Sequence, residues 1–389
     1  MSAGLATTAA APRPAVGTDV RWEDASFAVA APSGLVHATG GTPLDVPRGH
    51  EADVVAAVRE AFRRNGSRPG DGSLVCGVVP FDPDGTAELS LVRDIVRRPW
   101  APPAAGAGRT TREVPDDPGY RAAVAEALLR IGAGDLEKVV LARTLDTPLP
   151  VGSTVGAYLD RLAAANPHGW TFAVRTAAGL LTGASPELVA AVDGNGLVSH
   201  PLAGSRPRRA GETGPPADLL SSTKDHREHA LVVDHIAERL APLTHGLDVP
   251  AAPVPTATDT MWHLGTRITG TPRAGVGSLD AALRIHPTPA VSGVPVEAAL
   301  DLVRTLEPAP RGNYAGLVGW TDAAGHGEWA LVLRCALLDT GSGSARLWAG
   351  AGVVAGSTPD AEHAETAAKF ATALAALTGD DRPTEGPAQ

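Results

Sequence analysis

The feature that most limits how this chain can fold is a long series of short, apolar, strand-like runs. They lie at residues 138–143, 170–174, 179–182, 188–192, 197–202, 315–320, 329–338 and 346–354, with short turns between many of them. Strands joined by short turns pair in the antiparallel sense, whereas parallel strands need long crossover connections. The pattern therefore predicts an α+β fold with large, mostly antiparallel β-sheets and helices packed outside them.

Several segments between these runs have helical periodicity. Residues 51–64 place Val54, Val55, Val58 and Phe62 on one face. Asp117 followed by Pro118 is a favourable helix start, because Asp caps the first turn and Pro suits the first helical position. We expect that helix to bury Tyr120, Val124, Leu128 and Ile131, to end at Gly132 or Gly134, and a last helix to cover residues 359–377.

Residues 222–240 form a further predicted helix with an acidic residue beside its apolar face. That face is expected to contain Leu231, Val232, His235, Ile236 and Leu240. Glu228 lies one turn before Val232, at the edge of the buried face. A buried carboxylate needs a partner, which could be a Lys, an Arg or a metal ion. The alternative is an exposed ion pair between Glu228 and Lys224, four residues earlier.

Composition excludes several classes of function. The net charge of −10 argues against nucleic acid or an anionic membrane as the main partner, so an anionic substrate needs local positive groups or a metal. No stretch has the length of a membrane span. Residues 1–18 are expected to be a loose tail without the character of a signal peptide. Two distant cysteines, Cys76 and Cys335, predict a cytoplasmic protein without disulfides.

Lysine is rare in this chain. Of 33 basic residues, only Lys138, Lys224 and Lys369 are lysines, and all the others are arginines. A desolvated lysine can lose its proton, whereas arginine stays charged. These three positions are therefore candidates for chemistry or for close packing that a guanidinium cannot match.

The ordered motifs of the chain resemble those of the chorismate-utilising enzymes and, within them, the isochorismate synthases. The resemblance runs from about Phe27 to Leu377. It rests on Val79-Pro-Phe-Asp-Pro83, Gly134-Asp-Leu-Glu-Lys-Val-Val-Leu-Ala-Arg143, Gly183-Ala-Ser-Pro-Glu-Leu188, Pro201-Leu-Ala-Gly-Ser205, Lys224-Asp-His-Arg-Glu-His229, Trp262-His-Leu264, Leu283-Arg-Ile-His-Pro-Thr-Pro-Ala290, Ser292-Gly-Val-Pro295, Tyr314-Ala-Gly316, Gly327-Glu-Trp329, Gly350-Ala-Gly352 and Glu365-Thr-Ala-Ala-Lys369.

This resemblance implies a single domain at residues 19–378, between the tail at 1–18 and a flexible C-terminal tail at 379–389. In that domain two antiparallel sheets pack as a sandwich around the active site. The Pro-, Ala- and Gly-rich residues 100–109, which composition alone suggests as a linker between domains, then form a loop.

The resemblance also implies a reaction, the Mg²⁺-dependent and reversible conversion of chorismate to isochorismate. Water adds to one ring carbon and the ring hydroxyl leaves from another, which needs a base and an acid on opposite faces. Lys138 matches the general base of the family and Glu187 the general acid. Glu187 must then keep its proton near neutral pH, which burial favours.

Glu228 and Glu365 match the two carboxylates that hold Mg²⁺, and Glu362 is expected beside them. Tyr314 and Arg334 match the pair that holds the enolpyruvyl carboxylate. His263 resembles the histidine beside the ring, although a hydrogen-bonded core histidine is the alternative. The expected substrate-binding residues are Gly204, Ser205, His263, Thr288, Ala290, Tyr314, Arg334, Gly350, Gly352 and Lys369.

Two positions favour hydroxylation within the family. Aminating relatives usually carry Gln in place of Lys138, and aminodeoxychorismate synthases carry a nucleophilic Lys in place of Ala203. Residues 286–295 resemble the monofunctional isochorismate type. Salicylate synthase, which goes on to release pyruvate, is the alternative.

The remaining expectations concern the setting of the reaction. We expect a monomer without a glutamine amidotransferase subunit, and isochorismate supply for a siderophore of the 2,3-dihydroxybenzoate type or else for menaquinone. Pro310 and Thr223 replace residues that are frequently acidic in relatives, which leaves the loop geometry near them open.

Overall fold

The first large sheet combines strands from both ends of the chain. In the computed structural model, which describes residues 21–48, 51–104, 114–152, 154–209, 212, 214–258 and 260–378, this sheet has nine strands. They are β1 (Phe27–Ala31), β2 (Gly34–Ala38), β6 (Ile95–Arg98), β7 (Lys138–Pro148), β8 (Trp170–Thr176), β9 (Gly179–Ser185), β17 (Gly293–Val294), β20 (Cys335–Asp339) and β21 (Ser344–Val354). The order is β17-β7-β21-β20-β9-β8-β1-β2-β6.

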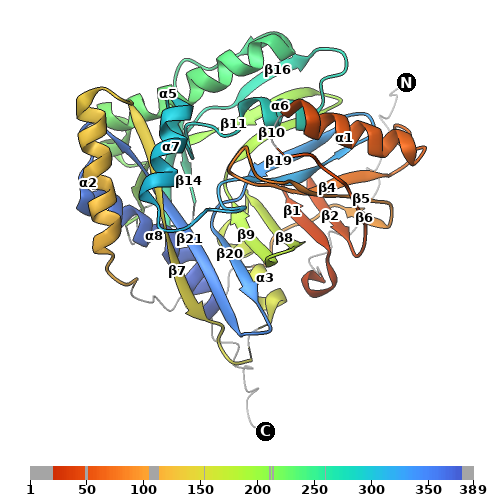
Figure 1. Cartoon of the computed structure of the whole chain (residues 1–389), viewed down its shortest axis with the longest axis horizontal. Coiled ribbons are helices and arrows are strands. Elements are labelled where there is room, and N and C mark those ends of the chain that lie inside the picture. The colour runs from red at the N-terminus through yellow and green to blue at the C-terminus, as the bar shows by residue number, and fades with distance from the viewer. Residues whose placement is uncertain are drawn as a thin grey trace, which may run out of the picture.

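A second nine-stranded sheet packs against the first (Figure 1). It contains β3 (Thr42–Pro43), β4 (Leu74–Val79), β5 (Glu88–Val92), β10 (Leu188–Asp193), β11 (Gly196–His200), β13 (Thr244–Asp248), β16 (Ile268–Pro272), β18 (Leu317–Asp322) and β19 (Gly327–Leu331). Its order is β13-β16-β11-β10-β19-β18-β4-β5-β3.

A small third sheet, which the sequence analysis does not predict, joins β12 (Leu202–Pro207), β15 (Met261–Gly265) and β14 (Val254–Ala257). Every strand pairing in the described residues is antiparallel. The expectation of an α+β fold built on large antiparallel sheets is confirmed.

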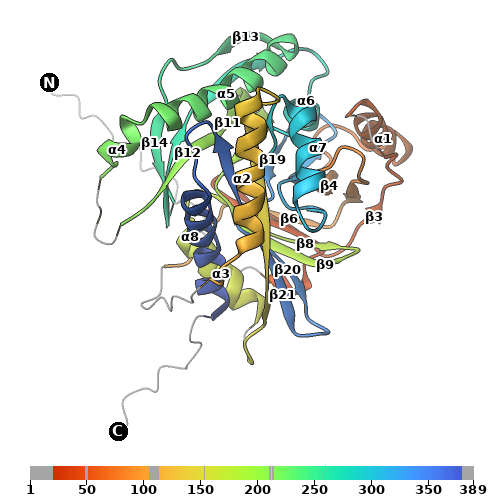
Figure 2. The same cartoon turned by 60° about the vertical axis from the view of Figure 1, so that its left-hand side comes forward.

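The helices lie outside the sheets (Figures 1 and 2). α3 and α8 cover the first sheet, α6 packs on β10 and β19 of the second, and α5 packs on β12 and β15 of the third. Their bounds are α1 (Glu51–Arg64), α2 (Pro118–Ala133), α3 (Val155–Ala165), α4 (Ala217–Leu220), α5 (Thr223–Leu240), α6 (Ser278–Ile285), α7 (Val296–Leu306) and α8 (Pro359–Thr378), with short 3₁₀ turns at Trp22–Asp24 and Ala241–Leu243.

The alternation along β1 shows why its strand is apolar at every position. Phe27 and Val29 belong to the core shared with the second sheet, whereas Ala28 and Ala30 pack in a separate cluster with α3 and α8. Successive side chains of a strand point to opposite faces, and both faces of this sheet are covered. Small alanines on the helix-covered face let the helices approach closely.

Two helix predictions need correction in detail. α2 starts as expected, with Asp117 accepting a hydrogen bond from the Tyr120 N–H, and it ends at Gly134 in the left-handed conformation. Ala127 is buried there, while Leu128 and Ile131 are only partly buried. In α5 the buried face contains His229, Val232, Val233, Ile236 and Leu240. Leu231 and His235 lie at its margin, because the face is rotated toward β12 and β15.

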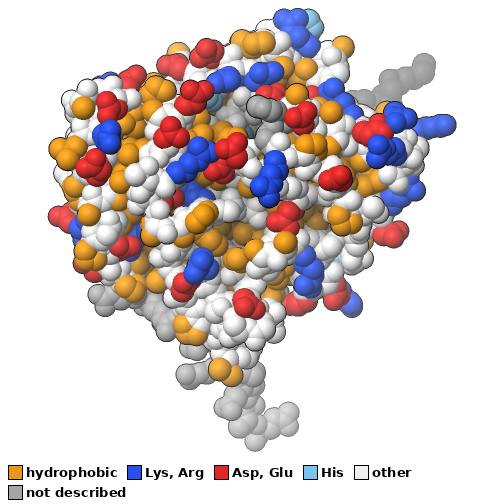
Figure 3. Space-filling view, viewed as in Figure 1, with side chains coloured by type: hydrophobic (Ala, Val, Ile, Leu, Met, Phe, Trp, Pro, Cys, Tyr) orange, Lys and Arg blue, Asp and Glu red, His pale blue; other side chains and the backbone are white. Residues whose placement is uncertain are grey.

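The surface seen in Figure 3 mixes acidic, basic and apolar side chains without a large region of one charge. In the described part of the chain, no helix combines the length and apolar character that crossing a membrane requires. The tails expected at 1–18 and 379–389 lie outside the described residues, as does part of the loop expected at 100–109.

Candidate active site

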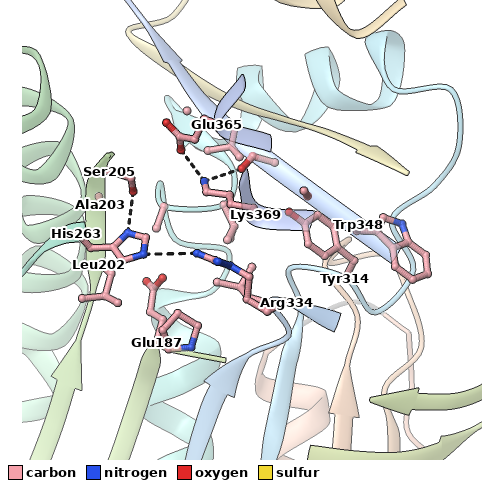
Figure 4. A pocket seen from close by; sticks show the side chains of 18 of the residues that line it. Glu187, Leu202, Ala203, Ser205, His263, Tyr314, Arg334, Trp348, Glu365 and Lys369 are labelled. Carbon is pink, nitrogen blue, oxygen red and sulfur yellow. Dashed lines mark hydrogen bonds and ion pairs between the residues drawn. The ribbon is translucent and has the colours of Figure 1, made fainter. Parts of the chain in front are cut away.

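Most of the expected site residues line one pocket, which lies where the first sheet meets the small third sheet (Figure 4). The expected residues in its wall are Glu187, Ser205, Glu228, His263, Ala290, Tyr314, Arg334, Gly350, Gly352, Glu365 and Lys369. They come from separate segments spread over residues 187–369 of the chain. The fold therefore brings together a site that the sequence shows only as scattered motifs.

Four expected residues do not line the pocket wall. Lys138 and Glu362 lie behind the wall. Lys138 forms an ion pair with the lining residue Glu228, and Glu362 forms one with Lys224. Gly204 has a φ of 72°, and a Cβ there would lie 2.8 Å from the Asp225 carbonyl oxygen, so this glycine lets β12 approach α5. Thr288 is buried, and its carbonyl accepts the Ser292 hydroxyl. Thr288 therefore shapes its loop and does not face the pocket.

The buried carboxylate on α5 has the partner that its position requires. Lys138, the first residue of β7, is fully buried, and its Nζ lies 3.0 Å from Oε1 of Glu228. Burial is the largest influence on Glu228 and would raise its pKa, but the ion pair with Lys138, together with the charges of Lys224 and Lys369, lowers the pKa overall. The alternative of a Lys224–Glu228 pair is wrong, because Lys224 reaches α8 instead.

All three lysines of the chain form ion pairs with glutamates in or beside the pocket wall. Besides the Lys138–Glu228 pair, Lys224 Nζ lies 3.0 Å from Glu362 Oε1. Lys369 Nζ lies 2.6 Å from Glu365 Oε1 and donates to the Gly350 carbonyl oxygen. The structure thus pairs each of the rare lysines with a glutamate, and their part in the chemistry stays a prediction.

The crowding of carboxylates suits a hard divalent cation. Lys224 lies within electrostatic reach of Glu228, Glu362 and Glu365. Burial raises the pKa of Glu362, and the negative charge of Glu365 raises it further. Mg²⁺ commonly takes one or two protein carboxylates and completes its shell with water and substrate oxygens. By donor chemistry, Glu228 and Glu365 therefore fit this ion.

Glu187 lies in the turn between β9 and β10, and its carboxyl points into the pocket (Figure 4). The Leu331 N–H donates to its backbone carbonyl, which fixes the turn against β19. Burial raises the pKa of Glu187 to about 8, and the opposing effects of the Leu202 backbone and of Lys138 are weaker. This carboxyl keeps its proton at neutral pH, as a general acid must.

A histidine and an arginine meet in the pocket wall. Ser205 on β12 and His263 on β15 are register partners, and the Ser205 hydroxyl lies 2.7 Å from His263 Nδ1. On the other side of the ring, Nε2 lies 3.5 Å from Arg334 Nη2. Burial lowers the pKa of His263 well below its usual value, and Arg334 lowers it further. His263 is therefore neutral, hydrogen-bonded and exposed to the pocket at once.

Arg334 is prepared to bind an anion. Burial lowers its pKa to about 10, so the guanidinium stays charged at neutral pH. Among the described residues no carboxylate forms an ion pair with it, and its φ of 49° lies in the left-handed region. That conformation costs roughly 1–2 kcal/mol for a residue other than glycine. A partly buried, strained cation without a carboxylate partner suits a substrate carboxylate.

Trp348 is a site residue that the sequence analysis missed. Its ring stacks on Tyr314 with a centroid distance of 6.1 Å and an interplanar angle of 10°, and both rings line the pocket. Trp348 precedes Gly350 and Gly352 by two and four positions on β21, so all three share one face of the strand. This two-residue spacing from the predicted site glycines could have identified Trp348 from the sequence. The other lining residues that the site prediction omits are Val140, Pro186, Leu202, Ala203, Val291, Leu333 and Ala349.

We expect Gly352→Ala to damage the carboxylate site. A Cβ at this position would lie 2.3 Å from Glu228 Oε1 and 3.2 Å from Lys138 Cε. Overpacking of this kind costs about 1–3 kcal/mol, and moving Glu228 should also weaken Mg²⁺ binding. Thermal unfolding and calorimetric Mg²⁺ titration measure the two effects. The control is Gly132→Ala, where a Cβ meets open space, and equal behaviour of the two variants would contradict the prediction.

Comparison with known proteins decides the family. Residues 94–378 match the sequence profile of a family described as "Chorismate binding enzyme". The chain belongs to the chorismate-binding enzymes. The pocket described above is therefore the candidate active site of a member of this family, and all of its lining residues lie within the matched range.

Two relatives and one solved structure within this family show the extent of the similarity. Isochorismate synthase DhbC of Bacillus subtilis is 41% identical over 345 residues, covering 83% of this chain and 84% of that protein. The vibriobactin-specific isochorismate synthase of Vibrio cholerae is 39% identical over 317 residues, covering 79% and 80%. A crystal structure of DhbC from Bacillus anthracis has a TM-score of 0.84 and 36% identity, covering 92% of this chain and 97% of that chain. The expected sandwich fold is confirmed.

Proposed function

We propose that this chain is an isochorismate synthase, which converts chorismate reversibly to isochorismate with Mg²⁺. The observation that carries the proposal is the buried carboxyl of Glu187, which faces the pocket and keeps its proton up to a pH of about 8. The similarity to enzymes named isochorismate synthases supports the same reaction. No step needs ammonia, so we also propose that the chain works without a glutamine amidotransferase subunit. That it is a monomer is a separate proposal.

Substrate binding follows from the positive groups of the pocket. Arg334 would hold the enolpyruvyl carboxylate of chorismate through its two-pronged guanidinium, and Tyr314 would donate its hydroxyl to the same group. Glu228 and Glu365 would hold Mg²⁺, which would supply positive charge for the ring carboxylate. These contacts explain how a protein with a net charge of −10 attracts a dianion.

The chemical step divides between two side chains. Lys138 would act in its neutral form, with Glu228 engaged by Mg²⁺ in place of the ion pair. It would then accept a proton from a water molecule whose oxygen bonds to one ring carbon. Glu187 donates its proton to the ring hydroxyl, which leaves from another carbon as water while the double bonds shift. One water is consumed and one released, so the overall reaction is an isomerisation. Proton exchange with solvent then restores both groups.

Product analysis tests the proposal directly. We expect purified protein to form isochorismate from chorismate with Mg²⁺, without salicylate or pyruvate, and to stop when a chelator is added. Chromatography separates these products. Salicylate together with pyruvate would instead indicate a salicylate synthase. Mg²⁺-dependent binding of chorismate without turnover would contradict an enzymatic function.

We further propose that the isochorismate supplies a siderophore of the 2,3-dihydroxybenzoate type, with menaquinone as the other destination. The similarity to DhbC and to the vibriobactin-specific enzyme supports this assignment. Deleting the gene in its own host should impair growth on iron-poor medium, and added 2,3-dihydroxybenzoate should restore it. A growth defect corrected only by menaquinone would contradict it. The free, buried Cys76 and Cys335 suit a reducing cytoplasm.

A further inference from the structure

Arg311 is a buried cation outside the pocket that contacts the pocket wall from behind. It lies between α7 and β18, and its side chain is 2% exposed. Nη1 donates to the Val291 carbonyl oxygen and Nη2 to the Val140 carbonyl oxygen, each at 2.7 Å. Nε and Nη2 bind the carboxylate of Glu307, which is also buried. The guanidinium is thus fully engaged and free of any role in binding substrate.

The groups that Arg311 binds belong to separate parts of the pocket wall. Val140 lies on β7, and Val291 lies in the loop between α6 and β17. Glu307 extends the connection, because its Oε1 accepts the Ala142 N–H at 2.8 Å. The guanidinium carbon of Arg311 also lies 5.8 Å from the centroid of the Tyr314 ring. Tyr314 faces the pocket (Figure 4). One side chain therefore joins β7, the loop and the tyrosine.

We infer that Arg311, anchored by Glu307, is a positioning residue that sets the spacing of the pocket wall at Val140, Val291 and Tyr314. The inference rests on the proposed function. Near the reacting centre, a misplacement of about 1 Å can cost roughly 100-fold in rate. A looser wall also gives bound isochorismate more freedom to break its ether bond. A ring hydrogen then moves to the enolpyruvyl carbon, and salicylate and pyruvate form without any co-reactant.

Only arginine has the geometry for this arrangement. In its planar fork, Nη1 and Nη2 each donate to one carbonyl, while Nε and Nη2 donate to the carboxylate, so Nη2 serves two acceptors. A lysine keeps the charge beside Glu307, but its three N–H donors leave from one nitrogen and do not reproduce the spread of the guanidinium, so it should hold β7 and the loop together less well. Arg311→Lys therefore separates the positioning role from the charge.

The experiment compares Arg311→Lys with Arg304→Lys, using chorismate and Mg²⁺. Arg304 lies on α7, is about half exposed and pairs with Asp82 and Asp84 at the surface. We expect Arg311→Lys to lower kcat/KM by about 10- to 100-fold, mostly through kcat, and to raise the pyruvate formed per isochorismate. Arg304→Lys should stay within about twofold of the wild type. A loss of folded protein alone would change neither KM nor the product ratio.

The outcomes separate this inference from the proposed function. If the wild type forms no isochorismate, the proposed function fails and the inference fails with it. If the wild type is active and Arg311→Lys has the same KM, product ratio and turnover per folded molecule, the inference alone is overturned. Should Arg311→Lys not fold, Glu307→Gln provides the same readouts, because it weakens the anchor of Arg311 and keeps an acceptor for the Ala142 N–H.

Discussion

Replacing Glu187 by Gln should lower kcat by about 10²- to 10⁴-fold while chorismate still binds, because the amide keeps the shape of the acid but cannot protonate the leaving hydroxyl. Steady-state kinetics and calorimetric binding measure the two quantities. The control is Glu328→Gln, since Glu328 is also buried but accepts hydrogen bonds from Ser33 and Trp170 outside the pocket. Comparable losses of kcat in both variants would contradict the assigned role.

The pH dependence of the wild type tests the same carboxyl. Burial raises the pKa of Glu187 to about 8, and the acid form is the active form. As pH rises through this value the carboxyl loses its proton, so kcat should fall on the alkaline side. In Glu187→Gln this alkaline limb should disappear from the residual activity. An unchanged limb in the variant would show that another group titrates.

Replacing Lys138 by Met should affect both catalysis and stability. Loss of the base should lower kcat by about 10²- to 10⁴-fold. Loss of the cation leaves Glu228 buried without its ion-pair partner, which typically costs about 3–5 kcal/mol. Kinetics and denaturant unfolding measure the two effects. Lys224→Met is the matched control, because it also removes a lysine from a buried carboxylate, Glu362, but from outside the pocket. It should retain most of the activity.

The stability loss in Lys138→Met should grow with pH. In the wild type the lowered pKa of Glu228 means that its carboxylate stabilises the fold above its unfolded-state pKa, and this contribution is lost as pH falls through the folded-state value. Without Lys138, burial dominates and raises the pKa of Glu228 above its ordinary value, so the variant loses stability as pH rises. The Tm difference between the two proteins should widen between about pH 4 and pH 7. A constant difference would mean that Glu228 does not titrate in this way.

Much of the fold could be predicted from local sequence. Asp117, Pro118 and Gly134 start and end α2 as expected, because caps act within one turn of a helix. Short turns between apolar runs predicted antiparallel sheets, since tight connections leave no room for a crossover. The rarity of lysine pointed to Lys138, Lys224 and Lys369, and the structure pairs all three with carboxylates in or beside the pocket.

The tertiary structure decided which groups meet. Glu228 could be predicted to need a partner, but Lys138 is 90 residues away. The packing of α5 against β21, the strand that pairs with β7 at Lys138, selects it over Lys224. Trp348 lines the pocket and stacks on Tyr314, whereas Thr288 is buried outside the pocket wall, where its carbonyl accepts the Ser292 hydroxyl. Spacing along a chain determines which side chains share a face of a helix or strand. It does not determine which face of another element this face will pack against, because the packing is a property of the whole assembled core.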